Sequence, residues 1–294
     1  MKFVKWMKAG GFLLALALVF VLCDLGFGRS TWIRDSGFFK LNDFELTCRD
    51  HPEEPWARVL YGSSELTSAY REDLSTTNYV NCGMDYATVL DLDRMLRRGV
   101  LNVSEELVIA ANWGLMCDTL DTNPTYPWLR GTFEPNFYFQ RDRLGPFLTD
   151  TWKYLLRDGE PRTRAYLEQQ KELYHGNMTA EELAERVTKL NGLYFAEGLD
   201  GFLENIAALP GVFDWCAEHD LRVRVLWLPE HPDFPLGEVN DAVRDAVRVQ
   251  CEAANVPFTD MTDELPADCF YDTGHLDWEH GAAVFTEVFD QWAS

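Results

Sequence analysis

Basic residues are scarce in this chain of 294 residues, which has 26 Lys and Arg against 48 Asp and Glu and a formal net charge of −22. A surface with such an excess of negative charge repels the phosphates of nucleic acids and the head groups of anionic lipids. We therefore exclude both as ligands. The chain also shows no internal repeat and no low-complexity segment, and its 47% hydrophobic residues are typical of a folded globular protein.

Cysteine and histidine residues at metal-ligand spacing are also missing, since the chain contains no Cys-x-x-Cys pair and no Cys/His cluster. This absence excludes a structural zinc site of the usual kind, and we expect neither a metal nor a cofactor. Of the seven cysteines, Cys23 lies in an apolar N-terminal stretch. The other six are Cys48, Cys82, Cys117, Cys216, Cys251 and Cys269. An even number allows disulfides in an oxidising compartment, and buried free thiols are an equal alternative.

Charge is nearly absent from the stretch Ala9 to Gly28, in which Asp24 is the single charged residue. A helix of this length spans about 30 Å, which is the thickness of the hydrocarbon core of a bilayer. Three lysines precede it (Lys2, Lys5 and Lys8) and favour a cytoplasmic N-terminus. A cleaved signal peptide is the rival interpretation, but no small-residue cleavage site follows the apolar core.

These features predict three parts of the chain. Residues 1–28 form a cytoplasmic tip and a single transmembrane anchor, residues 29–56 form an irregular linker, and residues 57–294 form an extracytoplasmic domain at the cell membrane. Within that domain, residues 115–200 are rich in aromatic residues and prolines, with helical patterns around 151–173 and 179–190. We interpret them as a mostly helical insertion that serves as a lid or a docking surface.

Short apolar runs alternate with amphipathic helical patterns along the rest of the domain. The runs that predict strands are 57–61, 78–83, 106–111, 222–229 and 257–260, and a last helix is expected at about 279–292. Such alternation predicts an α/β fold with a parallel sheet covered by helices on both faces. We therefore expect a three-layer αβα, flavodoxin-like arrangement with a central parallel sheet of about five strands.

Residues able to perform acyl chemistry follow several of these predicted strands. Ser64 follows the first, Gly83 ends the second and Asn112 follows the third, while Asp272 and His275 share a turn before the last helix. The carboxyl ends of parallel strands meet at one edge of a sheet, so we expect these residues to lie together. A serine nucleophile needs a base, here His275, and an acid to orient that base, here Asp272. The backbone amides of Ser64 and Gly83 and the side-chain amide of Asn112 are the candidate oxyanion hole.

Each of these residues also has an ordinary structural interpretation. A serine after a strand can cap a helix, a glycine can serve a turn, and an asparagine or aspartate can close a cap or a turn. His275 could be a surface histidine, with His280 as the rival base. Four further residues are weaker candidates for substrate binding: Ser63, Glu65, Trp113 and His231.

The order of these motifs resembles the SGNH (GDSL-type) hydrolase superfamily, and within it the DltD-like membrane-anchored proteins of cell-surface polymer D-alanylation. The segments that carry the resemblance are Gly62-Ser63-Ser64-Glu65, Val108 to Trp113, Leu226 to Pro229, and Phe270 to Leu276 with Gly281. The chain departs from the superfamily at Ser63, where Asp is usual, although DltD-like proteins share this serine. It also has Ala110 where many members have Gly, and Asn112 where DltD-like proteins commonly have Gln.

The resemblance implies a membrane-anchored serine acyl-transfer enzyme that moves or hydrolyses a D-alanyl or acetyl ester on a cell-surface glycan or teichoic acid. It also implies a membrane-bound O-acyltransferase as a partner. A plain carboxylesterase or deacetylase on the outer face of the membrane, and a non-catalytic anchored scaffold, are the alternatives. The acidic composition favours a cationic D-alanyl ester or a neutral glycan over a polyanionic polymer.

Overall fold

The computed structural model describes residues 2–29, 43–120, 126, 128–129 and 174–294. The chain divides into two compact units, which are Met1–Leu41 with Leu129–Glu168, and Asn42–Trp128 with Gln169–Ser294. In the first unit, helix α1 (Lys2–Arg29) is described, with exposed apolar side chains such as Phe12 and Leu14. Within the described ranges, no helix combines the length and the apolarity that crossing a membrane requires.

The second unit is built on a sheet of five parallel strands in the order β2-β1-β3-β4-β5. Their bounds are β1 (Trp56–Gly62), β2 (Val80–Gly83), β3 (Val103–Ala111), β4 (Arg222–Trp227) and β5 (Phe258–Asp260). The predicted α/β fold and five-stranded parallel sheet are therefore confirmed. β3 shows why the prediction works. Its last six residues are all buried, and five of them are apolar, with Glu106 as the exception.

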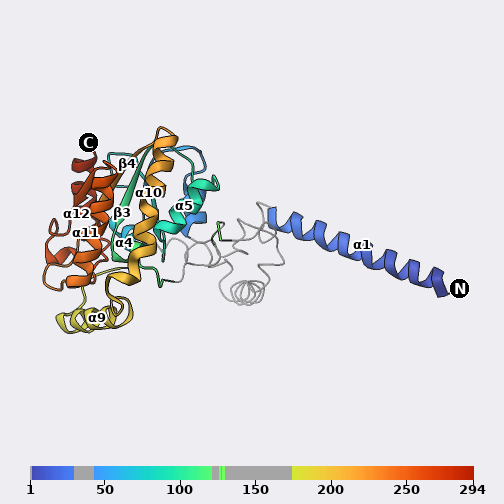
Figure 1. Ribbon diagram of the computed structural model, residues 1–294, viewed down its shortest axis with the longest axis horizontal. Coiled ribbons are helices and arrows are strands. Elements are labelled where there is room, and N and C mark those ends of the chain that lie inside the picture. The colour runs from blue at the N-terminus through green and yellow to red at the C-terminus, as the bar shows by residue number, and fades with distance from the viewer. Residues whose placement is uncertain (1, 30–42, 121–125, 127, 130–173) are drawn as a thin grey trace, which may run out of the picture. The chain divides into compact units, whose positions relative to one another are not determined.

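Helices cover both faces of this sheet (Figure 1). On one face, α4 (Ser64–Ala69) and α12 (Gly281–Ala293) share a core with β1, β3 and β4. Helix α10 (Leu203–Glu218) packs against α5 (Val89–Arg97) and α11 (Glu238–Ala253) on the other face. In α11, Val243, Val247 and Cys251 recur every fourth residue and are fully buried, as an amphipathic helix requires.

Two segments differ in detail from the sequence-based expectation. Part of the predicted linker, residues 43–50, is not irregular but forms α3 (Asp43–Asp50), because Phe44 and Leu46 bury their side chains beside β2. In the predicted insertion, the structure describes α6 (Trp113–Met116), α9 (Ala180–Leu193) and the 3-10 helix η2 (Gly198–Phe202). The helical pattern at 151–173 lies outside the described residues.

All seven cysteines are free thiols. Five of them are fully buried: Cys82, Cys117, Cys216, Cys251 and Cys269. Of the two alternatives that the sequence left open, the structure therefore has buried thiols rather than disulfides. Burial raises the pKa of the Cys216 and Cys251 thiols to about 12.

Candidate active site

The order of the strands brings the ends of β1 and β3 together at the point where the sheet changes direction. Gly62, the last residue of β1, pairs with Gly83 of β2 on one side and with Ala110 of β3 on the other. In doubly wound sheets, ligands bind at this switch point beyond the carboxyl ends of the strands. The chain turns here directly from β1 into α4, whose first residue is Ser64.

Ser64, His275 and Asp272 lie in hydrogen-bond contact, although 211 residues separate the serine from the histidine. The Ser64 hydroxyl oxygen is 3.1 Å from His275 Nε2. On the other side of the imidazole, His275 Nδ1 is 2.9 Å from Asp272 Oδ2 and 3.1 Å from Oδ1. The structure thus joins the three residues that the sequence proposed as nucleophile, base and orienting acid.

The Asp272 carboxylate is held by its own turn. Its Oδ1 accepts hydrogen bonds from the backbone N–H groups of Gly274, at 3.0 Å, and His275, at 2.8 Å. Burial alone raises the pKa of Asp272. The charge of His275 and the hydrogen bond from its ring, the charge of Arg186 and the Gly274 N–H outweigh burial and hold the pKa at about 2. Because the ionised carboxylate can only accept, the neutral imidazole carries its proton on Nδ1 and leaves Nε2 to accept from Ser64.

The imidazole of His275 is surrounded by groups that affect its charge. Burial lowers the pKa of His275, whereas the carboxylates of Asp272 and Glu65 raise it and the guanidinium of Arg186 lowers it. The balance leaves the pKa above the ordinary value for histidine. The ring of Tyr174 stacks on the imidazole, with centroids 4.2 Å apart.

Glu65, predicted as a substrate-binding residue, is buried rather than displayed to solvent. A side chain at Gly274 would collide with its carboxyl group, so the glycine of the Asp-Thr-Gly-His turn makes room for Glu65. Burial raises the pKa of Glu65 to about 7, although the charge of His275 and a hydrogen bond from Asn112 oppose the shift. Glu65 is therefore a titratable group close to the base.

Ser63 and Asn112 join the ends of β1 and β3. The Asn112 amide donates to Ser63 Oγ at 2.9 Å, and the Ser63 hydroxyl is 3.2 Å from Asn112 Oδ1. Asn112 also caps α6, because its Oδ1 accepts from the Leu115 N–H at 2.8 Å. Ser63 is thus buried against Asn112, and the predicted oxyanion role of Asn112 requires its amide to change partners.

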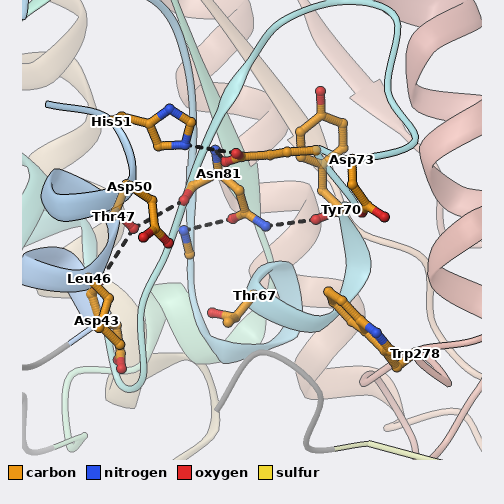
Figure 2. A pocket seen from close by; sticks show the side chains of 12 residues that line it. Asp43, Leu46, Thr47, Asp50, His51, Thr67, Tyr70, Asp73, Asn81 and Trp278 are labelled. Atoms are coloured by element: carbon orange, nitrogen blue, oxygen red, sulfur yellow. Dashed lines mark hydrogen bonds and ion pairs between the residues drawn. The ribbon is translucent and has the colours of Figure 1, made fainter. Parts of the chain in front are cut away.

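Gly83 lines a cavity of about 510 Å³ at the β2 edge of the sheet (Figure 2). Its backbone N–H already donates to Asn81 Oδ1 at 2.9 Å, and Asn81 Nδ2 donates to the Tyr70 carbonyl at 2.9 Å. Neither Ser64 nor His275 lines this cavity. Among the three predicted oxyanion donors, the Ser64 amide stands in the first turn of α4, where no intrahelical acceptor exists. The oxyanion role of Gly83 stays a prediction.

The remaining weak candidates pack against other side chains. Trp113 is half-buried, with its ring centroid 5.3 Å from Tyr194 and 5.4 Å from Phe195. His231 is buried, and its backbone N–H donates to the carbonyl of Thr273 at 3.1 Å. His231 therefore supports the turn that carries His275.

Two residues of the site, Arg186 and Tyr174, were missed by the sequence-based reasoning. Arg186, on α9, places Nη2 at 2.7 Å from Asp272 Oδ2. Tyr174 is held near the site because its carbonyl accepts from the Trp278 N–H at 2.8 Å. Both belong to the segment that we predicted as an insertion, and no motif around either residue marks its partner.

Among the described residues, possible metal ligands gather at Asp268, Cys269 and His280, whose donor atoms lie within 4.8 Å of one another. Asp268 and His280 are exposed and lie close together, with His280 Nε2 3.8 Å from Asp268 Oδ2. His280, the rival base, is thereby directed to Asp268.

Comparisons with known proteins find distant structural similarity. No family model matches the chain, and no curated protein matches it. Two similar solved structures are a putative acylhydrolase from Bacteroides fragilis NCTC 9343 and a GDSL-like lipase from Bacteroides thetaiotaomicron VPI-5482. The first is 13% identical with a TM-score of 0.43, covering 84% of this chain and 93% of that one. The second is 11% identical with a TM-score of 0.43, covering 85% and 96%. Similarity at this level assigns no role to any residue of this chain.

Proposed function

We propose that the protein is a serine esterase or O-acyltransferase of the SGNH (GDSL-type) kind, with Ser64 as nucleophile. The observation that carries the proposal is the continuous contact from Ser64 Oγ through His275 to Asp272, at 3.1 and 2.9 Å. A serine, a histidine and an ionised carboxylate in this order form the arrangement that activates a serine hydroxyl for attack on an ester.

The reaction would proceed in two steps. Ser64 Oγ bonds to the ester carbonyl carbon while His275 Nε2 takes the hydroxyl proton, and the Ser64 amide donates to the developing oxyanion. The tetrahedral intermediate then releases the alcohol, which receives the proton from His275, and leaves an acyl group on Ser64. Water or an acceptor hydroxyl next attacks the acyl carbon and gives its proton to His275, and the C–O bond to Ser64 then breaks as Ser64 Oγ takes that proton back from His275. Asp272 keeps the imidazole oriented throughout.

The test is the Ser64→Ala variant of the purified full-length chain, assayed with p-nitrophenyl acetate. We expect hydrolysis to fall by about 10³-fold or more, because the nucleophile is lost. A fluorophosphonate probe should also modify the wild type on the peptide that contains Ser64 and leave Ser64→Ala unmodified. The matched control is Ser68→Ala, since Ser68 is buried on the same helix and donates to the Glu65 carbonyl instead of contacting His275. Unchanged hydrolysis and labelling in Ser64→Ala would exclude the enzymatic function.

The finer proposal is that this site acts at the outer face of the cell membrane, on an ester of a surface polymer. It is supported by the apolar run Ala9 to Gly28 and by the DltD-like motifs around Ser64 and His275. The acyl group would be D-alanyl or acetyl, the acceptor a hydroxyl of a glycan or teichoic acid, and the donor a membrane-bound O-acyltransferase. The net charge of −22 favours a cationic D-alanyl ester or a neutral glycan.

Two measurements test the finer proposal separately from the chemistry. The full-length chain should remain in the membrane pellet after an alkaline carbonate wash, whereas release into the supernatant would contradict the anchor. Cells that express Ser64→Ala should show altered ester-linked acyl groups on the surface polymers compared with the wild type. If the purified wild-type chain hydrolyses p-nitrophenyl acetate while surface acylation is the same in both strains, the protein is an esterase with another substrate.

A further inference from the structure

Arg186 lies on α9 and contacts Asp272, the residue that orients His275, although the two are far apart in the sequence. Its Nη2 is 2.7 Å from Asp272 Oδ2, and the same oxygen lies 2.9 Å from His275 Nδ1. The guanidinium and the imidazole therefore share one carboxylate oxygen. The other oxygen, Oδ1, is occupied by the backbone N–H groups of Gly274 and His275.

This contact differs from an ion pair optimised for stability. Arginine usually binds a carboxylate through two parallel hydrogen bonds, which satisfy two of its nitrogens. Here Arg186 contacts Asp272 through Nη2, while its Nε is buried without an acceptor among the described residues. A buried donor without a partner is unfavourable, so the position of Arg186 requires an explanation other than a gain in stability.

Charges face His275 from three elements. Asp272 lies on its own turn, Glu65 comes from α4, and Arg186 comes from α9, while the neutral ring of Tyr174 stacks on the imidazole. Two carboxylates favour the protonated imidazole, and one guanidinium opposes it. A base must be unprotonated to accept the serine proton, so carboxylates without an opposing positive charge would leave less of the imidazole available near neutral pH.

We propose that Arg186 is a positioning residue, which partly neutralises Asp272 so that His275 stays available as a base near neutral pH. The inference rests on the proposed function, in which His275 accepts the proton of Ser64. Arg186 acts through Asp272, to which its guanidinium is bound. Helix α9 thus contributes a positive charge to the candidate active site. Displacement of α9 would remove that charge from Asp272 and His275.

The decisive variant is Arg186→Gln in the full-length chain, with two readouts. The first is the pH dependence of kcat/KM for p-nitrophenyl acetate, and the second is the titration of the His275 imidazole by NMR, assigned with His275→Gln. We expect the acidic limb of the profile and the His275 titration to move to higher pH together. For a shift of one pKa unit, activity at pH 6 falls about tenfold and activity at pH 9 stays near the wild type.

Two controls separate charge from structure. Lys189→Gln removes the same charge from an exposed position on α9 and should leave both readouts unchanged. Arg186→Lys keeps the charge and should lie closer to the wild type than Arg186→Gln does. A uniform loss of activity at every pH, or equal shifts in Arg186→Gln and Arg186→Lys, would overturn the inference.

The failure of this inference can be told apart from the failure of the proposed function. If Ser64→Ala abolishes hydrolysis but the His275 titration is the same in the wild type and Arg186→Gln, the enzyme stands and the role of Arg186 is wrong. If Ser64→Ala retains hydrolysis, the enzymatic function fails, whereas the NMR titration still reports whether Arg186 controls the charge of His275.

Discussion

At the scale of single residues, the site depends on how one buried turn distributes charge. Asp272 accepts hydrogen bonds from the backbone N–H groups of Gly274 and His275, which are two and three residues further along the chain. Because these contacts are local, the Asp-x-x-His spacing alone predicts that Asp272 and His275 lie together. Glu65 is different, because its environment is made by Gly274 and His275 from the opposite end of the chain. The glycine in the turn is what allows a second carboxyl group to lie next to the base.

Glu65 leads to a prediction about stability and pH. Its folded-state pKa of about 7 is above the ordinary value near 4.5. Folding is therefore penalised once the unfolded carboxyl ionises, and the penalty grows as the pH rises from 4.5 to 7 and is then constant. Glu65→Gln removes it, so the variant should gain about 3 kcal/mol in free energy of unfolding at pH 9 and less than half of that at pH 5.5.

Chemical denaturation at the two pH values measures this difference. Glu185→Gln, on the exposed face of α9, is the control and should change stability little at either pH. A Glu65→Gln variant that is less stable than the wild type at pH 9 would show that the ionised carboxylate is satisfied in the folded protein.

At the scale of elements, the strands were predictable because the sheet buries them on both faces. The last residues of β1 and β3 form continuous apolar runs, and their ends place Ser64 and Asn112 at one edge. Helix α3 was not predictable from its sequence, since its eight residues include Asp43, Glu45 and Asp50 and bury only a short face.

The contacts between elements set the limit of sequence-based prediction. Gly83 ends β2 and Asn112 follows β3. The groups that engage their N–H donors, Asn81 and Ser63, depend on side-chain packing in three dimensions. The same is true of Arg186, since helical periodicity marks α9 but cannot say which carboxylate the helix will approach. The candidate nucleophile, base and acid were therefore visible in the sequence, and the groups that contact them from other elements were not.

At the scale of the whole molecule, the free thiols are distributed through the interior and give a test of the entire fold. Cys82 lies in β2, Cys216 in α10 and Cys251 in α11, so their protection reports on both the sheet and its covering helices. Burial raises the pKa of Cys269 to about 11, which keeps the thiol protonated. A protonated thiol reacts slowly with alkylating reagents, in addition to being shielded from them by burial. Cys48 is half-buried, and Cys23 on α1 is exposed.

We therefore expect two stages when the full-length chain is alkylated without reductant and weighed by mass spectrometry. In the folded protein, Cys23 and Cys48 should react first, while the five buried thiols react slowly because unfolding must expose them. In guanidinium chloride, all seven cysteines should be alkylated without reductant. A parallel sample treated with reductant should have the same mass, because no disulfide is present to be opened. Fewer adducts in the sample without reductant would show a disulfide and contradict the fold, since the buried thiols would have to pair.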